Sequence, residues 1–458
     1  MDTLTRPIQV AIDRTEPAYR YKTAVAYLVL TVLFGADAVR YSTGWLGWVI
    51  ALGLGFVGVV GYLVRFRPTA TLRRVPWLLW ALLGYMALSI TWSNYPGFTV
   101  AGTAAQLVTT LAALFFVAAF SWRDLLRLIA NTLRALLLAS AVIEVWAAVV
   151  VRGPIAPLVP NPMGANLSLG AAQWVQGDLL TGGRIQGIVG NANLVGYLAM
   201  VGAILFAVQW AVDATHRWLS IASFALALGI MVLSRSASIL FAVIAVIMAA
   251  TVSLIAEGRA QEFRHRLYRL TLVGLFLAVF FVLQYRETIF EAIGKAPDAS
   301  GRGEIWYAVF RLIRQRPIEG WGWISYWMPG AKPLDHLIRV EGVQIYSAHN
   351  AYFDTWMQLG LIGLLLLLVL LVRTFIKIWQ LGVRHTSPLY LWPLLVMVGI
   401  LVQNLTESRM LIENGWMLLV ILMVKVNEPD ESLEPRGRSP KIARVPIARR
   451  WRPKQISR

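Results

Sequence analysis

The chain has 458 residues, of which 58% are hydrophobic and 14% are charged, and its mean hydropathy is +0.62. This composition excludes a soluble globular protein, because too little polar surface is available to cover the apolar mass, and it predicts a polytopic membrane protein. The chain contains no cysteine, which excludes disulfides, thiolate catalysis and cysteine-type zinc sites. The net charge of +18 is spread unevenly along the chain.

The apolar runs predict an all-α protein with about 12 transmembrane helices, at about 17 to 25 apolar residues per span. The predicted spans are residues 23–40, 45–64, 76–92, 100–120, 126–151, 190–212, 218–234, 237–255, 269–285, 357–379, 388–405 and 411–426. No compelling cleavage site follows the first run. We therefore expect a retained first helix rather than a signal peptide.

Basic residues cluster in alternate connections between the predicted helices. The main clusters are Arg65/Arg67/Arg73/Arg74, Arg123/Arg127/Arg134, Arg259/Arg264/Arg266/Arg269 and Arg373/Lys377/Arg384. Most of the 42 lysines and arginines fall on this side, together with both termini. By the positive-inside rule, both termini are expected in the cytoplasm.

The pattern divides the chain into five parts. Residues 1–22 are expected to form a cytoplasmic N-terminus, 23–285 a bundle of nine helices, 286–356 a large non-cytoplasmic catalytic loop, and 357–426 the last three helices. Residues 427–458 are expected to form a disordered, basic cytoplasmic tail, in which a short acidic part (428–434) precedes a part (436–458) with nine basic and no acidic residues that is attracted to anionic lipids. Nucleic-acid binding by the tail is a weak alternative.

Within the large loop, residues 304–316 show the periodicity of an amphipathic helix that ends before Pro317. The apolar arc consists of Ile305, Trp306, Val309, Phe310 and Ile313, and the opposite face carries Glu304, Arg311, Arg314 and Gln315. We expect this helix to lie on the membrane surface or to cap the bundle.

Several arginines lie on the side that the positive-inside rule disfavours. They are Arg40, Arg152, Arg184, Arg235 and Arg409. A guanidinium at the outer surface suits the phosphates of a lipid diphosphate, because its planar fork donates bidentate hydrogen bonds. The alternative is that each arginine snorkels to headgroups or pairs with a carboxylate such as Asp37 or Glu144. Phosphate binding is favoured for Arg184 and Arg302 together, because both stand in distinctive polar motifs.

His349 lies where the large loop re-enters the membrane. Its imidazole has the basicity to take a proton from a sugar hydroxyl near neutral pH, although the residues alone favour a structural histidine at a helix N-terminus. His216, His265 and His385 are predicted to be cytoplasmic, and His336 has no supporting motif. The loop carboxylates are scattered, so no metal site is predicted.

Six polar motifs, taken in their order along the chain, resemble the O-antigen ligase and polymerase superfamily of bacterial membrane glycosyltransferases. They are TWSNYP (91–96), RIQGIVGNANLVGY (184–197), LSRSA (233–237), SGRGEIW (300–306), PxxGWG (317–322) and HNxY (349–352) with its following GxxG (360–363). This resemblance implies a helical membrane bundle with a long outer loop of short helices.

The resemblance also implies an activity. A glycan on an undecaprenyl diphosphate donor would be passed, with inversion and without a metal or other cofactor, to an acceptor hydroxyl on the outer face of the membrane. Arg184 and Arg302 would hold the diphosphate and stabilise the charge on the leaving group. His349 would be the base that activates the acceptor. Arg235 fits the family's serine-arginine turn, in a phosphate-binding or a structural role.

Three further residues in these motifs are expected to contribute to substrate binding: Asn193, Trp306 and Asn350. One position departs from the family, because Gln358 stands where members often carry a glutamate. Ligases and polymerases share the motifs, so the acceptor could be a lipid-anchored glycan, a growing repeat unit, a wall polymer or a protein. A ligase is slightly favoured, since the compact loop offers no obvious site for a second long glycan.

The competing class is a transporter, because about twelve spans is also a common number for transporters. The sequence shows no internal repeat, no charged pathway through the spans, and polar motifs on one face, all of which disfavour transport. A non-catalytic scaffold is the remaining alternative.

Overall fold

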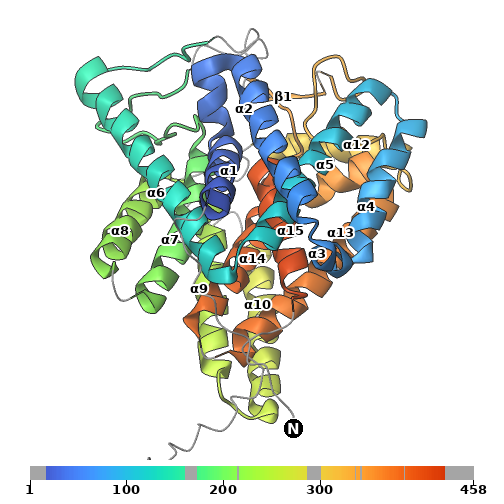
Figure 1. Ribbon diagram of the computed structural model, residues 1–458. Helices are drawn as coiled ribbons and strands as arrows, with labels where there is room; N and C mark the ends of the chain where they lie inside the picture. Colours follow the sequence, from blue (N-terminus) through green and yellow to red (C-terminus); the bar gives the residue numbers. More distant parts are fainter. Residues whose placement is uncertain are drawn as a thin grey trace, which may run out of the picture.

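The computed structural model describes residues 17–159, 173–213, 216–285, 301–335, 337–340, 343–385 and 387–428. Most of the predicted N-terminal segment, the start of the large loop, His336 and nearly all of the basic tail lie outside these residues. Where the chain is described it is a bundle of α-helices, with one hairpin of two-residue strands, β1 (Arg339–Val340) and β2 (Val343–Gln344) (Figure 1). The predicted all-α membrane architecture is confirmed.

The helices follow the predicted apolar runs closely. They are α1 (Pro17–Phe34), α2 (Ala36–Phe66), α3 (Thr69–Arg74), α4 (Trp77–Leu88), η1 (Ser89–Thr91), α5 (Pro96–Ala119), α6 (Trp122–Trp146), η2 (Ala147–Val151), α7 (Ala192–Val212), α8 (Arg217–Ser234), α9 (Ala237–Ala256), α10 (Gln261–Gln284), α12 (Arg302–Gln315), α13 (Ala351–Arg384), η4 (Pro388–Tyr390), α14 (Leu391–Gln403), η5 (Arg409–Leu411) and α15 (Glu413–Lys425).

Seven helices in the described part of the chain are long and apolar enough to cross a membrane. They are α2, α5, α6 with η2, α7, α8, α9 and α13, and two shorter apolar helices are formed by α4 with η1 and by η4 with α14. Each of the twelve predicted ranges contains helix, but twelve membrane crossings remain a prediction.

The first two predicted spans are divided differently from the prediction. The range 23–40 is interrupted, because α1 ends at Phe34 and α2 begins at Ala36. Within α2, Gly44 has φ 73° and ψ −178°, which breaks the helix just before the second predicted span. The glycine conformation, rather than a change in hydropathy, therefore sets this boundary.

The centre of the bundle is formed by α7, α14 and α15, whose side chains are buried almost throughout. The outer helices show the opposite pattern, since only 17% of the apolar window of α2 and 28% of that of α8 are buried inside the protein. Large exposed side chains such as Leu54, Val57 and Val232 lie on these outer faces. A continuous exposed apolar surface of this kind suits lipid rather than water.

The helix α12 confirms the predicted amphipathic pattern. Ile305, Val309 and Ile313 are buried in a separate apolar core formed with residues 321–334 and the start of α13. The four polar residues predicted on the opposite face are exposed. This helix caps one end of the bundle next to α13 (Figure 1).

The segment after α12 is fixed by backbone pairing with a broken part of α13. Gly360 has φ 64°, and a Cβ atom there would lie 1.9 Å from the Ile318 oxygen. Across this close approach, Leu361 N donates to Pro317 O at 2.9 Å and Gly322 N donates to Gln358 O at 2.8 Å. The glycine therefore permits a strand-like contact between two motifs that are far apart in sequence.

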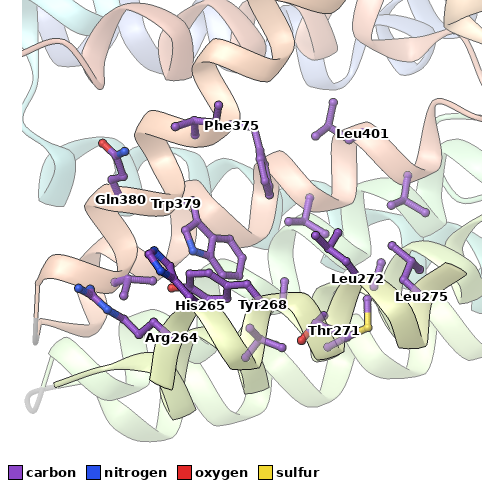
Figure 2. Close-up of a pocket in the computed structure, with 18 of the residues that line it drawn as sticks. Arg264, His265, Tyr268, Thr271, Leu272, Leu275, Phe375, Trp379, Gln380 and Leu401 are labelled. Atoms are coloured by element: carbon purple, nitrogen blue, oxygen red, sulfur yellow. The ribbon is translucent and has the colours of Figure 1, made fainter. Parts of the chain in front are cut away.

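The opposite end of the bundle gathers the basic clusters. Lys377 donates to the side chain of Asn427, which in turn donates to Arg74 O at 3.1 Å, so segments from two of these clusters meet there, next to the end of α15. Between α9, α10, α13 and α14, a cavity of about 750 Å³ reaches the same end (Figure 2).

Candidate functional site

The connection between α14 and η5 forms the floor of the candidate site. Ala351 N donates to Asn404 O and to Glu407 O, both at 3.0 Å. The Asn350 side chain caps α13 by accepting hydrogen bonds from Tyr352 N and Phe353 N, and it donates to Leu405 O at 2.9 Å. These bonds fix the start of α13, and with it His349, against residues 404–407.

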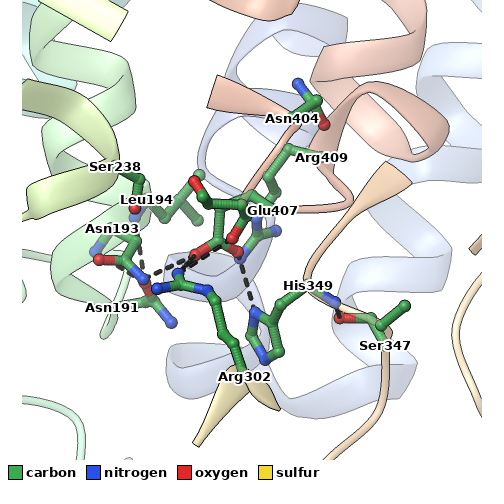
Figure 3. A network of polar contacts seen from close by, with 12 residues as sticks. Asn191, Asn193, Leu194, Ser238, Arg302, Ser347, His349, Asn404, Glu407 and Arg409 are labelled. Carbon is green, nitrogen blue, oxygen red and sulfur yellow. Dashed lines mark hydrogen bonds and ion pairs between the residues drawn. The ribbon is translucent and has the colours of Figure 1, made fainter. Parts of the chain in front are cut away.

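Glu407 is the centre of the polar network. Its Oε2 lies 3.2 Å from His349 Nδ1, and its Oε1 accepts from Asn193 Nδ2 at 2.7 Å and from Arg302 Nη2 at 3.3 Å (Figure 3). The carboxylate is nearly buried, with its side chain 8% exposed, whereas the imidazole is 31% exposed. One carboxylate thus orients groups from α7, α12 and the segment before α13.

His349 has the left-handed backbone conformation, with φ 46°. A neutral imidazole that donates its Nδ1 hydrogen to Glu407 keeps Nε2 as a hydrogen-bond acceptor. Among the described residues, Nε2 has no partner. The arrangement is therefore that of a base whose tautomer is fixed by a carboxylate.

Arg302 is the first residue of α12 and reaches towards the same carboxylate. Its Nη2 also donates to Thr406 O at 3.0 Å, while its buried Nε has no partner among the described residues. The remaining guanidinium nitrogen, Nη1, has no described protein partner either, so the guanidinium keeps donors for a ligand.

Arg184 joins the network through Asn193. Its Nη2 donates to Asn193 Oδ1 at 2.8 Å, and its Nε donates to Ser234 O at 3.1 Å. Ser236 donates to the same Asn193 oxygen at 2.9 Å. A cavity of about 210 Å³ is bounded by Arg184 and the N-terminus of α7, where helix N–H groups and a guanidinium both favour an anion.

The loop that carries Arg184 is shaped by α6. Glu144 accepts from Gln186 N at 2.6 Å and from Gly187 N at 2.7 Å, and Ser140 accepts from Ile188 N at 3.2 Å. Gly187 has φ 62°, and a Cβ atom there would lie 2.7 Å from Ser140 Oγ. Glu144 therefore holds backbone amides of this loop rather than one of the outer arginines.

The electrostatics keep Glu407 charged. Burial alone would raise the pKa of its carboxyl group, but the nearby His349, Arg302 and Arg409 outweigh burial and lower the pKa from 4.5 to about 2. The network thus holds an anion among cations at any pH near neutrality. In the described part of the chain, no three His, Asp and Glu side chains are grouped to hold a metal ion.

The other predicted substrate-binding residues have different surroundings. Arg235 has φ 47° at the end of α8, and its exposed side chain extends towards Gly182. Trp306 donates to Ala348 O at 3.1 Å and packs edge-on against Phe353, so it supports the segment before His349. The Asn350 amide is used in the helix cap described above. Substrate contacts by these three residues remain predictions.

The other arginines that the sequence singled out lie outside the hydrogen-bonded network around Glu407. Arg40 forms ion pairs with Asp37 at 2.5 Å and with Glu413 at 2.7 Å, which makes it structural. Arg409 donates to Tyr326 OH at 3.1 Å behind the site, and Arg152 is exposed.

Gln358 also has a structural role. Its Oε1 accepts from Ile324 N at 2.9 Å and from Ser325 N at 3.1 Å, and its Nε2 donates to Asp354 at 3.1 Å. An uncharged amide can serve donors and acceptors together, which a carboxylate at this position could not do. Gln358 thus ties α13 to residues 324–325 and does not belong to the network around Glu407.

Glu407 is the functional candidate that the sequence motifs missed. It stands in a short connection with no motif around it, where only Arg409 is singled out by the positive-inside rule. Its position is nevertheless informative, because a lone carboxylate in a short connection between apolar helices is expected to pair with a nearby cation.

Comparison with known proteins gives a family match over part of the chain. Residues 222–368 match the family described as O-Antigen ligase, a range that includes Arg235, Arg302 and His349 but not Arg184 or Glu407. The chain is also similar to the exopolysaccharide production protein ExoQ of Rhizobium meliloti (strain 1021), with 28% identity over 92 residues. That similarity covers 19% of this chain and only 21% of the relative.

Proposed function

Because the chain belongs to the O-antigen ligase superfamily of membrane enzymes, we propose that it is a glycosyltransferase that uses a glycan linked to undecaprenyl diphosphate. The glycan would pass to an acceptor hydroxyl at the outer face of the bacterial cytoplasmic membrane. The observation that carries this proposal is the convergence of Arg302, His349 and, through Asn193, Arg184 on the buried carboxylate of Glu407.

The two arginines would bind the donor diphosphate. Each guanidinium uses one Nη atom within the protein and keeps Nη1 without a described partner, and the cavity beside Arg184 opens at the N-terminus of α7. Guanidinium pairs bind phosphate oxygens in a defined geometry, and their charge stabilises the diphosphate as it leaves.

The proposed step is a single displacement. The acceptor oxygen forms a bond to the anomeric carbon as the bond between that carbon and the diphosphate oxygen breaks, and its electron pair stays on the diphosphate. The acceptor proton moves to His349 Nε2, and Glu407 stabilises the resulting imidazolium through Nδ1. Attack from the face opposite the leaving group inverts the anomeric centre. No metal is required by this scheme.

The location of the network supports an outer active site. The network lies at the end of the bundle opposite the contacts among the basic clusters, which the positive-inside rule assigns to the cytoplasm. Under this proposal both termini are cytoplasmic, and residues 286–356 form the loop that covers the site.

A ligase and a polymerase remain two versions of this function. The compact capping core around α12 favours a ligase, because it occupies the space beside His349. The similarity to a protein named for exopolysaccharide production favours a polymerase as the second candidate. The two differ only in the acceptor.

The test compares purified wild type with His349→Ala and with His216→Ala, which changes an exposed histidine at the other end of the bundle. Each protein is incubated with undecaprenyl diphosphate-linked glycan from the source cells and a membrane acceptor fraction, with a chelator present. Free undecaprenyl diphosphate and the product mass are followed by mass spectrometry.

We expect release by wild type and His216→Ala, and a loss of about 100-fold or more for His349→Ala, in line with removal of a general base. The product mass distinguishes ligase from polymerase. Equal release by all three proteins would remove His349 from the mechanism. No release by any protein, together with movement of the lipid-linked glycan across vesicles by wild type, would favour the transporter.

A further inference from the structure

The cavity between α10 and α13 lies far from the candidate site and at the basic end of the bundle. It is about 750 Å³ in volume, which is within the usual range of about 300–1,000 Å³ for ligand pockets. Its wall comes from four helices, α9, α10, α13 and α14. The proposed glycosyl transfer does not use it.

The basic side chains labelled in Figure 2 lie at one end of this cavity. Arg264, His265 and Gln380 lie together in Figure 2, and Leu272, Leu275 and Leu401 lie at the other end. Arg384, near the end of α13, also lines the cavity. The cavity therefore has a cationic end and an apolar end.

The cationic end has no internal counter-charge. None of the described residues that line the cavity is Asp or Glu, and within the described part of the chain neither Arg264 nor Arg384 forms an ion pair. Two guanidinium groups and an imidazole in one place favour an anion from outside the protein.

The dimensions match one leaflet of a bilayer. Arg264 and Leu275 are eleven residues apart on α10, which corresponds to about 16 Å along a helix. The hydrocarbon core is about 30 Å thick, so half of it is about 15 Å. Tyr268 and Trp379 pack edge-on, with ring centroids 5.5 Å apart, just beyond the cationic end, where interfacial aromatic residues are typical.

We propose that this cavity binds an anionic phospholipid of the leaflet at the basic end, with its phosphate at Arg264 and Arg384. An acyl chain would lie along Leu272, Leu275 and Phe375. Basic pockets between transmembrane helices recognise acidic headgroups by this combination of charge and apolar wall. The inference does not depend on the glycosyl transfer.

The first experiment measures lipid binding to the full chain by native mass spectrometry, with phosphatidylglycerol and phosphatidylcholine titrated into the detergent. Wild type is compared with the double variant Arg264→Ala/Arg384→Ala. The matched control is Arg266→Ala/Arg373→Ala, which removes two exposed arginines from the same helices but outside the cavity.

We expect wild type and the control to prefer phosphatidylglycerol, and the cavity variant to lose about tenfold or more of its affinity for that lipid. Equal losses in both variants would show a general surface-charge effect and overturn the proposal. So would equal binding of the two lipids by wild type. Displacement of the lipid by glycerol phosphate at the same concentration would show a simple phosphate site and would also overturn it.

A second measurement needs no variant. A photoreactive phosphatidylglycerol, with the reactive group in its acyl chain, is crosslinked to wild type in vesicles and the labelled peptides are sequenced. Labels on α10 and α13 between the cationic end and Leu275 or Phe375 support the proposal. Labels confined to other helices overturn it.

Discussion

The two ends of the bundle use arginine in opposite ways. At the end that carries the candidate site, which is the outer end under the proposed topology, Arg184 and Arg302 are held by Asn193, Glu407 and backbone oxygens, at distances of 2.8 to 3.3 Å. At the basic end, Arg264 and Arg384 border an open cavity without a carboxylate partner among the described residues.

Under the two proposals, this difference in how the arginines are held corresponds to two different uses of positive charge. Donors that are fixed before the substrate arrives can stabilise charge at one defined position, and they need not reorganise during reaction. Cations without a protein partner attract an anion by their charge but do not define its position. We therefore expect the outer end to be sensitive to the shape of each side chain and the basic end to be sensitive only to charge.

The largest effect is expected from Arg302→Lys. Lysine keeps the charge but cannot reproduce the planar fork, in which Nη2 reaches Thr406 and Glu407 while the other nitrogens would bind the diphosphate. We expect the release of undecaprenyl diphosphate to fall by about 100-fold or more. Arg311→Lys, on the exposed face of the same helix, is the control. Transfer at the wild-type rate would mean that charge alone is sufficient at this position.

A smaller loss of transfer, about 10- to 100-fold, is expected from Glu407→Gln. The neutral amide cannot stabilise the imidazolium of His349 as the negatively charged carboxylate can. Exposed Glu304→Gln is the control, and Glu407→Asp should recover part of the activity. If Glu407 only supported the fold, the pH profile of the remaining activity would be unchanged. A shift in that profile supports its action through His349.

The effect of Glu407→Gln on stability should also depend on pH. The pKa of Glu407 is lowered in the folded protein, so its contribution to stability is present above about pH 4.5 and is lost as the pH falls towards about 2. The difference in melting temperature between wild type and Glu407→Gln should therefore be constant near neutrality and shrink in acid. A difference that grows in acid would contradict the assigned charge.

Arg235→Ala should have a milder effect, below about tenfold on transfer, because its side chain is exposed outside the network. The rate is measured as for Arg302, with Arg152→Ala as the control for loss of an exposed outer arginine. Complete loss at normal expression would instead identify Arg235 as a phosphate contact.

The smallest effect is expected at the basic end. Arg264→Lys/Arg384→Lys should keep the preference for phosphatidylglycerol within about threefold of wild type, because headgroup attraction depends on charge. Native mass spectrometry checks this value. A loss as large as that of the alanine pair would show that the cavity, too, requires a fixed guanidinium geometry.

The sequence predicted the elements that depend on periodicity and on local chemistry. The α12 helix followed from its apolar arc, and Arg184, Arg302 and His349 followed from motifs that lie near one another in the structure. Asn350 carried a readable signal as well, since asparagine before a helix is a common N-cap, and its expected substrate contact stays a prediction.

The remaining features depend on contacts between distant segments. Glu407 has no local pattern, and its importance arises only when residues from α7, α12 and the start of α13 surround it. The ion pairs of Arg40 likewise join α2 to Glu413 across almost the whole chain. The hydropathy of a segment and the spacing of its residues do not indicate which distant segment it will contact.

The interruption of α13 at Gly360 has a consequence for how the protein tolerates different membranes. Backbone hydrogen bonds tie residues before the interruption to residues 321–322 and 404–407, and Leu361 and Ile362 just after it are tied to Pro317 and Ile318. Beyond Ile362 the chain continues as a long apolar helix. A transmembrane helix whose apolar length exceeds the thickness of the hydrocarbon core tilts to fit it. We expect such tilting to be taken up at Gly360, so that the position of His349 is set by protein contacts and stays independent of acyl-chain length.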